Sequence, residues 1–273
     1  MAYAYAWPFD PAVYLLLAAL LAGHSLLARG TALRLRQRLY FLIGLFLVWL
    51  ALETPLATLG NSYLVTANMA QHMLLVAFAS PFLLLGLNDA MAARVFRVRL
   101  LRWLTEPIVA LVLYAAGMIL WHLSGPFDFA LEHGGVILVE HLTFLVLGLL
   151  YWSCLIRATS RQARWSLTDP QKLVLLFFGS LPMMAVALPF QFAGWAFYAP
   201  YVAAPRLNGF FSPVVDQTVA GALMMTLDMT AMAVDGLVVF FRWFNGEVNR
   251  DFRRAANPSQ FTEDPEDQEA LEA

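Results

Sequence analysis

Long apolar stretches recur along the chain, most of them close to twenty residues long. They lie at about 12–28, 39–59, 64–87, 107–124, 134–154, 171–193 and 214–241. Because an α-helix rises about 1.5 Å per residue, roughly twenty apolar residues cross the ~30 Å hydrocarbon core of a bilayer. The sequence shows no ten-residue alternation of the kind that marks membrane β-barrel strands. The pattern therefore predicts an all-α, polytopic membrane protein, a seven-transmembrane-helix bundle.

The basic residues divide the connecting segments into two groups. Sixteen of the seventeen Lys and Arg residues follow the first, third, fifth and seventh stretches, and Arg206 alone falls in a segment of the other group. Short cytoplasmic loops of membrane proteins retain Lys and Arg. We therefore expect the N-terminus outside and the C-terminus in the cytoplasm.

Composition supports a membrane setting and suggests two regions. With 60% hydrophobic and 13% charged residues, a soluble domain could not cover itself with polar surface, so the lipid bilayer is the expected surrounding. Residues 1–245 are predicted to form the transmembrane domain, and the acidic, proline-containing residues 246–273 a disordered cytoplasmic tail. The charge distribution gives no support for nucleic-acid binding.

Four of the five histidines fall at similar depth near the predicted outer face. His72, His122 and His141 lie in the third, fourth and fifth stretches, and His133 lies in the loop between the last two. Ionisable residues inside a membrane are costly and tend to mark function. This constellation favours a metal or cofactor site, in which Glu140 is a candidate partner that orients an imidazole.

Methionines accompany these histidines at helical spacing. Asn68 and Met69 stand one turn before His72, Met73 follows it, and Gln217, Met224 and Asp228 share a face of the last stretch. Soft thioethers together with imidazole suit Cu(I). The structural alternative is that these methionines only fill gaps in the core. Asp228 is also a candidate for a polar interior path.

The segment before the last stretch is rich in aromatic residues and carries the one basic residue expected outside. Trp195, Phe197, Tyr198 and Tyr201 are typical interfacial anchors, and they could also cap the site. Loops held by a rigid bundle commonly carry recognition, so Arg206 and Asn208 are candidate partner-binding residues.

Several blocks of the sequence together resemble a known family. The run from Asn68 to Gly86, NMAQHMLLVAFASPFLLLG, is similar to the third span of the CtaG-type cytochrome c oxidase assembly factors, multi-pass proteins of the bacterial inner membrane. Trp121-His122, the segment Glu140 to Phe144, and the run from Pro205 through Asp216-Gln217 to Met224 resemble its other blocks.

This resemblance implies a non-enzymatic accessory protein for haem-copper oxidase that helps copper reach the buried copper centre. The expected partners are oxidase subunits and a periplasmic copper chaperone. The positions that match the family are His72, His122, His141, Asp216, Gln217 and Met224, whereas Asn68 stands where the family often has histidine. Two other functions stay open on the residues alone: a haem-binding membrane cytochrome, and a metal-free structural subunit of a respiratory complex.

Overall fold

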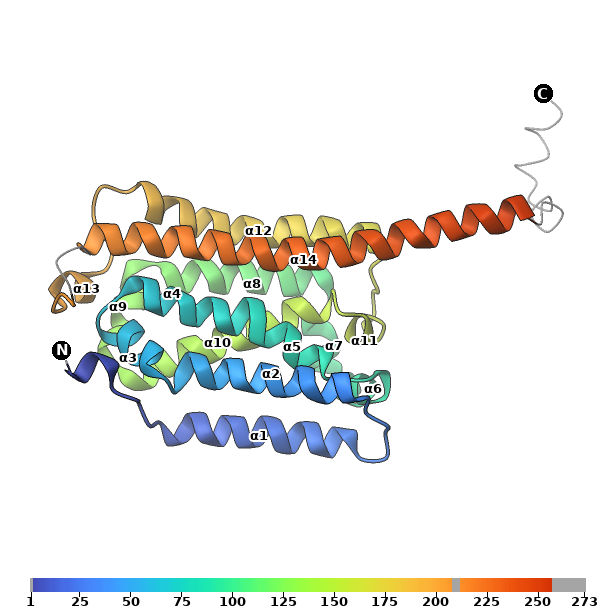
Figure 1. Ribbon diagram of the computed structural model, residues 1–273, viewed down its shortest axis with the longest axis horizontal. Coiled ribbons are helices and arrows are strands. Elements are labelled where there is room, and N and C mark those ends of the chain that lie inside the picture. The colour runs from blue at the N-terminus through green and yellow to red at the C-terminus, as the bar shows by residue number, and fades with distance from the viewer. Residues whose placement is uncertain (1, 208–211, 257–273) are drawn as a thin grey trace, which may run out of the picture.

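The protein folds as a bundle of long, nearly parallel helices (Figure 1). A computed structural model describes residues 2–207 and 212–256, and all regular structure in those ranges is helical. Six helices are long and apolar enough to cross a membrane, and a bent pair of helices would make a seventh span. The prediction of an all-α, multi-pass membrane protein is thus confirmed, with six or seven spans.

The first half of the chain forms η1 (Ala2–Tyr5), α1 (Pro11–Ala28), α2 (Leu35–Leu52), α3 (Pro55–Ser62), α4 (Val65–Met73), η2 (Leu74–Ala79), α5 (Ser80–Leu85), α6 (Asp89–Val95) and α7 (Arg99–Leu104). The second half forms α8 (Pro107–His122), α9 (Ser124–Glu132), α10 (Gly134–Ser153), α11 (Arg157–Ser160), α12 (Asp169–Phe192), α13 (Ala199–Ala203) and α14 (Pro213–Ala256).

Two apolar clusters hold the bundle together. The larger one joins α4, α8, α10, α12 and α14, and the smaller one joins α1 and α2 to the following spans. In Figure 1, α1 lies at one edge of the bundle and the packed pair α12 and α14 at the other. Helices α4 and α10 therefore occupy the interior, where a buried site can form.

The third predicted span is one continuous helical path that widens in the middle. Helix α4 runs into η2, a π-helical turn, and then into α5. Pro81 has no backbone N–H and so removes a hydrogen bond of the regular ladder. The Ser80 hydroxyl bonds the Leu75 carbonyl at 2.8 Å, and the Trp152 indole N–H donates to the Val76 carbonyl at 2.9 Å. The Leu75 carbonyl thus accepts both the backbone N–H and the hydroxyl of Ser80, and the Val76 carbonyl finds its partner on α10.

The fourth predicted span, 107–124, ends earlier than expected and bends sharply. Helix α8 stops at His122, and α9 leaves it at 69°. Pro126 lacks the N–H that would bond the His122 carbonyl and would also crowd that carbonyl in a straight helix. The Tyr198 hydroxyl bonds the freed carbonyl instead, at 2.9 Å.

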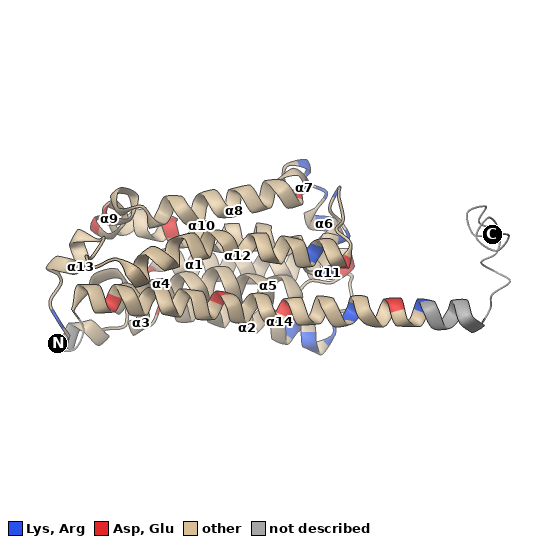
Figure 2. Ribbon diagram, turned by 90° about the horizontal axis from the view of Figure 1, so that it is seen from above, with Lys and Arg blue, Asp and Glu red and all other residues tan. Residues whose placement is uncertain are grey.

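The two ends of the bundle differ in charge. Lys and Arg gather at the end formed by α6, α7 and α11, here called the arginine end (Figure 2). The opposite end, here called the histidine end, is formed by η1, α3, α9 and α13 (Figure 1). Helix α14 projects beyond the arginine end and continues past residue 246, where the tail was predicted to begin, to Ala256. Residues 257–273 of that predicted tail lie outside the described residues.

Candidate metal centre

Three helices bring three histidines together near the histidine end. His72 comes from α4, His122 from the last turn of α8, and His141 from α10. Their side chains are 1%, 8% and 2% exposed. His72 lies between the other two: its ring centroid is 5.5 Å from that of His122 and 5.2 Å from that of His141. The clustering of these three predicted ligands is a feature of the fold.

Two of the imidazoles are held with one nitrogen free. His122 Nδ1 lies 2.6 Å from the Met118 carbonyl oxygen, and His141 Nδ1 lies 2.7 Å from that of Ile137. Since a carbonyl can only accept, Nδ1 carries the proton in each ring. Nε2 of both rings is buried and has no hydrogen-bond partner. Histidines that bind metals are commonly fixed in this way, with the other nitrogen donating to a carbonyl.

The spacing of the rings is close to that of imidazoles that share an ion. Two imidazoles bound to one tetrahedral ion at about 2.0 Å have ring centroids about 5 Å apart. As the side chains lie, however, no set of three or more His, Cys, Asp or Glu residues in the described ranges is arranged to hold a metal ion. Coordination of one ion by all three rings therefore requires rotation of their side chains. Coordination by only two of the rings requires a further ligand of another type.

His72 has two unusual polar neighbours. Both of its ring nitrogens are buried without a hydrogen bond, and Nε2 lies 3.4 Å from Oε1 of the fully buried Glu140. The amide of Asn68, one turn earlier on α4, is also buried with neither atom bonded. Buried polar groups are nearly always satisfied in folded proteins. A bound cation would take up the free lone pairs among these atoms, those of the imidazole nitrogens, the Glu140 carboxylate and the Asn68 amide oxygen, so the residues present fit a metal ion.

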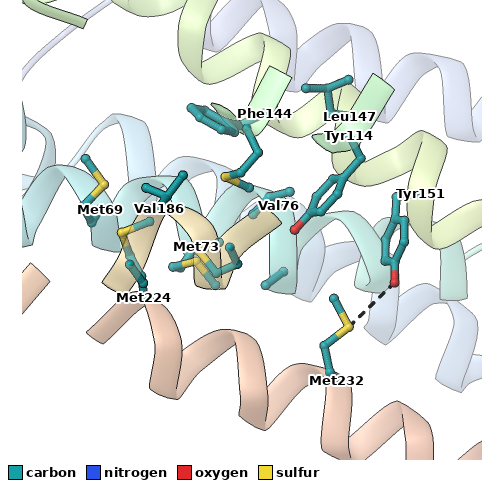
Figure 3. Close-up of a cluster of buried hydrophobic side chains, with 14 of the residues drawn as sticks. Met69, Met73, Val76, Tyr114, Phe144, Leu147, Tyr151, Val186, Met224 and Met232 are labelled. Atoms are coloured by element: carbon teal, nitrogen blue, oxygen red, sulfur yellow. Dashed lines mark hydrogen bonds between the residues drawn. The ribbon is translucent and has the colours of Figure 1, made fainter. Parts of the chain in front are cut away.

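The methionines predicted as ligands lie in the same part of the core. Met69, Met73 and Met224 are fully buried and gather between α4 and α14 (Figure 3). They belong to the apolar cluster that includes Phe144, whose ring centroid lies 4.2 Å from that of His72. The packing role that was the structural alternative therefore holds for these methionines.

Aromatic rings enclose the histidines, and the sequence reasoning did not select them as part of the site. Phe127, Phe144 and Phe190 are buried, and each has its ring within 6.3 Å of His72 or His122. The i, i+3 spacing of His141 and Phe144 on one helix could have indicated a shared face. These rings exclude water from the imidazoles on several sides.

The aromatic segment before α14 serves in part as a cap. Trp195 is 67% exposed, as an interfacial anchor would be, whereas Tyr198 and Tyr201 are 1% and 2% exposed. Burial raises the pKa of both phenols well above the usual range, so their hydroxyls keep the proton that each donates. Tyr198 bonds the carbonyl of His122, and Tyr201 bonds that of Gly60 at 2.5 Å. These two hydroxyls thereby tie the segment before α14 to the end of α8 and to α3.

Asp216 and Gln217, two of the positions that match the family, have structural partners. The Asp216 carboxylate accepts from the backbone N–H groups of Val65 and Thr66 at 2.7 and 3.1 Å, and so caps α4 across the bundle. The Gln217 side chain accepts from the N–H of Phe197 and donates to the Trp195 carbonyl. Both residues position elements that carry the site.

The other predicted residues lie apart from the three imidazoles. His133 is exposed and stacks on Phe129. Asp228 is buried near Tyr114, which lies two helical turns deeper than His122. The Arg206 guanidinium donates to carbonyls of α13, and the adjacent candidate Asn208 lies outside the described residues.

Comparison with known proteins gives one family. Searches among curated proteins and among solved structures find no match. The model of the family described as cytochrome c oxidase caa3 assembly factor matches residues 12–246, which include all seven predicted spans and every described candidate residue. With so much of its length matched, the chain belongs to the family of caa3-type cytochrome c oxidase assembly factors.

Proposed function

We propose that this assembly factor binds Cu(I) between His72, His122 and His141 and helps to deliver it to the copper centre of a cytochrome c oxidase. Membership of the family supports the role in oxidase assembly. The observation that carries the copper site is the set of buried imidazole nitrogens without partners, from three helices, with ring centroids 5.2 and 5.5 Å apart.

The donor types favour Cu(I). Neutral imidazole and thioether ligands bind this soft ion well, and the absence of thiolate from the proposed set keeps binding exchangeable. In the proposed site, a methionine from α4 or α14, among Met69, Met73 and Met224, completes the coordination. One buried carboxylate, that of Glu140, balances the charge of one monovalent ion, which lowers the cost of holding the ion in a low-dielectric interior.

The proposed setting is the bacterial plasma membrane with the histidine end outside. The arginine end then faces the cytoplasm, in accordance with the retention of basic residues on that side. This orientation presents the site to a periplasmic copper chaperone and to the outer side of the oxidase.

The alternative of a membrane cytochrome has less support. Two axial imidazoles on opposite faces of a haem would have ring centroids more than about 6 Å apart. The pairs at His72 are closer than this, and Phe144 packs against the same ring.

Elemental analysis tests the copper site. The detergent-purified protein is loaded with Cu(I) under reducing conditions, and the wild type is compared with the triple variant His72→Ala, His122→Ala, His141→Ala. The double variant His24→Ala, His133→Ala is the matched control, because His24 lies on α1 against Phe41 and His133 stacks on Phe129, both outside the cluster. We expect copper in the wild type and control and its loss from the triple variant; equal copper in all three would refute the ligand set.

A further inference from the structure

A pocket with both polar and apolar lining residues leads from the histidine end toward His141. It has a volume of about 320 Å³ and lies between the N-terminal segment, α3, α4 and α10. These elements lie together near the N-terminus in Figure 1. Its lining includes the exposed residues Ser62 and Gly134 and the fully or nearly fully buried side chains of Gln71 and His141. The pocket thus joins surface positions to one imidazole of the cluster.

Unpartnered polar atoms occur along this lining. Oδ1 of Asn61, Oε1 of Gln71 and Nε2 of His141 are all buried and have no hydrogen-bond partner in the protein. The Gln71 amide donates to the Ala51 carbonyl at 2.9 Å, which fixes the side chain and leaves its oxygen free. Of these three atoms, the imidazole nitrogen of His141 is the one that suits Cu(I), because amide oxygens are hard ligands. Apolar residues such as Val13, Leu52 and Ile137 make up much of the remaining lining.

The pocket is large enough for a cation that still carries ligands. At about 30 Å³ per water molecule, its volume corresponds to about ten waters. It is far too small for a folded partner, so a carrier protein would have to release its ion at the pocket. Asp10 also lines the pocket, and its carboxylate favours the approach of positive charge.

The other sides of the histidine cluster are closed by aromatic rings. Phe127, Phe144 and Phe190 pack around His72 and His122, and Tyr198 covers the end of α8. An ion arriving by those sides would have to displace buried rings. The pocket offers His141 as the first ligand, and the neighbouring His72 as the second.

We infer that this pocket is the access route by which Cu(I) passes between the outer aqueous face and the histidine cluster, with Gln71 and His141 as the first buried contacts. The inference rests on the proposed function and adds the direction of transfer, from His141 to His72. A substitution that narrows the pocket should slow copper movement while leaving the number of ions bound unchanged.

Two adjacent glycines provide a matched pair of variants. Gly134 lines the pocket and Gly135 does not, yet both are exposed in the first turn of α10, and an added Cβ at either meets no atom within 4 Å. Gly134→Trp and Gly135→Trp are each purified as full-length protein in detergent and loaded with Cu(I). The release of copper to the water-soluble chelator bathocuproine disulfonate is followed by absorbance, and total copper is measured separately.

We expect Gly134→Trp to release copper at least about tenfold more slowly than the wild type, which corresponds to a barrier raised by about 1.4 kcal/mol. Gly135→Trp should match the wild-type rate, and all three proteins should hold the same amount of copper. Equal rates at full copper content would overturn the route and leave the proposed copper site standing. A wild type that holds no copper would overturn both.

A second pair keeps the test decisive if Gly134→Trp does not fold. Ser62 and Ser124 are both exposed serines near the histidine end, and only Ser62 lines the pocket. Ser62→Trp should slow release and Ser124→Trp should not. The same slowing in both variants would overturn the route, because bulk anywhere on this face would then account for the effect.

Discussion

The Asp216 carboxylate of α14, which caps the start of α4, offers a test of what holds α4 and its His72 in place. Asp216 is fully buried and accepts three hydrogen bonds through its carboxylate, from the N–H groups of Val65 and Thr66 and from the Thr66 hydroxyl at 2.6 Å. Asp216→Ala leaves the two N–H groups at the start of α4 without an acceptor. The Thr66 hydroxyl keeps its bond to the Asp216 backbone carbonyl.

The cost follows from these contacts. A hydrogen bond to a charged group contributes about 1.5–3 kcal/mol, and loss of a helix cap costs about 0.5–2 kcal/mol. Because the two estimates overlap for the same groups, we expect Asp216→Ala to lower the free energy of unfolding by about 2–4 kcal/mol. For a chain of this size, that shifts the thermal midpoint by roughly 5–15 °C.

Thermal unfolding in detergent, followed by helical circular dichroism, measures the shift. Asp10→Ala is the matched control, since Asp10 caps α1 with a single bond from the Ala12 N–H at 2.9 Å in a part-exposed position. Its expected cost is about 0.5–1 kcal/mol. Amide hydrogen exchange should also quicken at Val65 and Thr66 in Asp216→Ala. If Asp216→Ala loses no more stability than Asp10→Ala, the cross-bundle cap does not hold α4.

Two further substitutions test the packing around the site. Gly60→Ala would place a Cβ 2.9 Å from backbone atoms of Asn68, so α3 must move away from α4, and we expect a loss of about 1–3 kcal/mol. Gly23→Ala, where the added Cβ meets no atom within 4 Å, should be neutral or stabilising, and equal thermal midpoints for the two variants would contradict the close approach. Tyr198→Phe removes the hydroxyl that bonds the His122 carbonyl and should cost about 0.5–1.5 kcal/mol in the same unfolding assay; no loss would show that water replaces it.

The helices and the similar depth of the three histidines could be predicted from the sequence, because both depend on the position of each residue along an apolar stretch. A stretch of apolar residues must form a helix in lipid, and its length fixes where His72 or His141 lies along it. The early end of α8 was also encoded locally, by Pro126 two residues after the predicted end at 124, but hydropathy does not detect such a break.

The roles of Asp216 and Tyr198 could not be read from the sequence. The partners of Asp216 are 150 and 151 positions away, and the partner of Tyr198 is 76 away. Such contacts depend on how the helices pack, which periodicity leaves open. The helical end of α14 was missed for a different reason: an exposed helix needs only local support, such as the pair between Arg250 and Glu247, and composition averaged over an acidic tail hides it.

The early end of α8 has a consequence for the surrounding lipid. Its sixteen residues span about 24 Å, roughly 6 Å less than an ordinary hydrocarbon core. Hydrophobic mismatch of this size is met by local thinning of the bilayer or by tilting of neighbouring elements. Helix α9 turns away from α8 by 69° at the bend and exposes Phe129, so it adds little to the length that α8 spans. Thinning of the bilayer beside α8 would bring water closer to the end of that helix, where His122 lies.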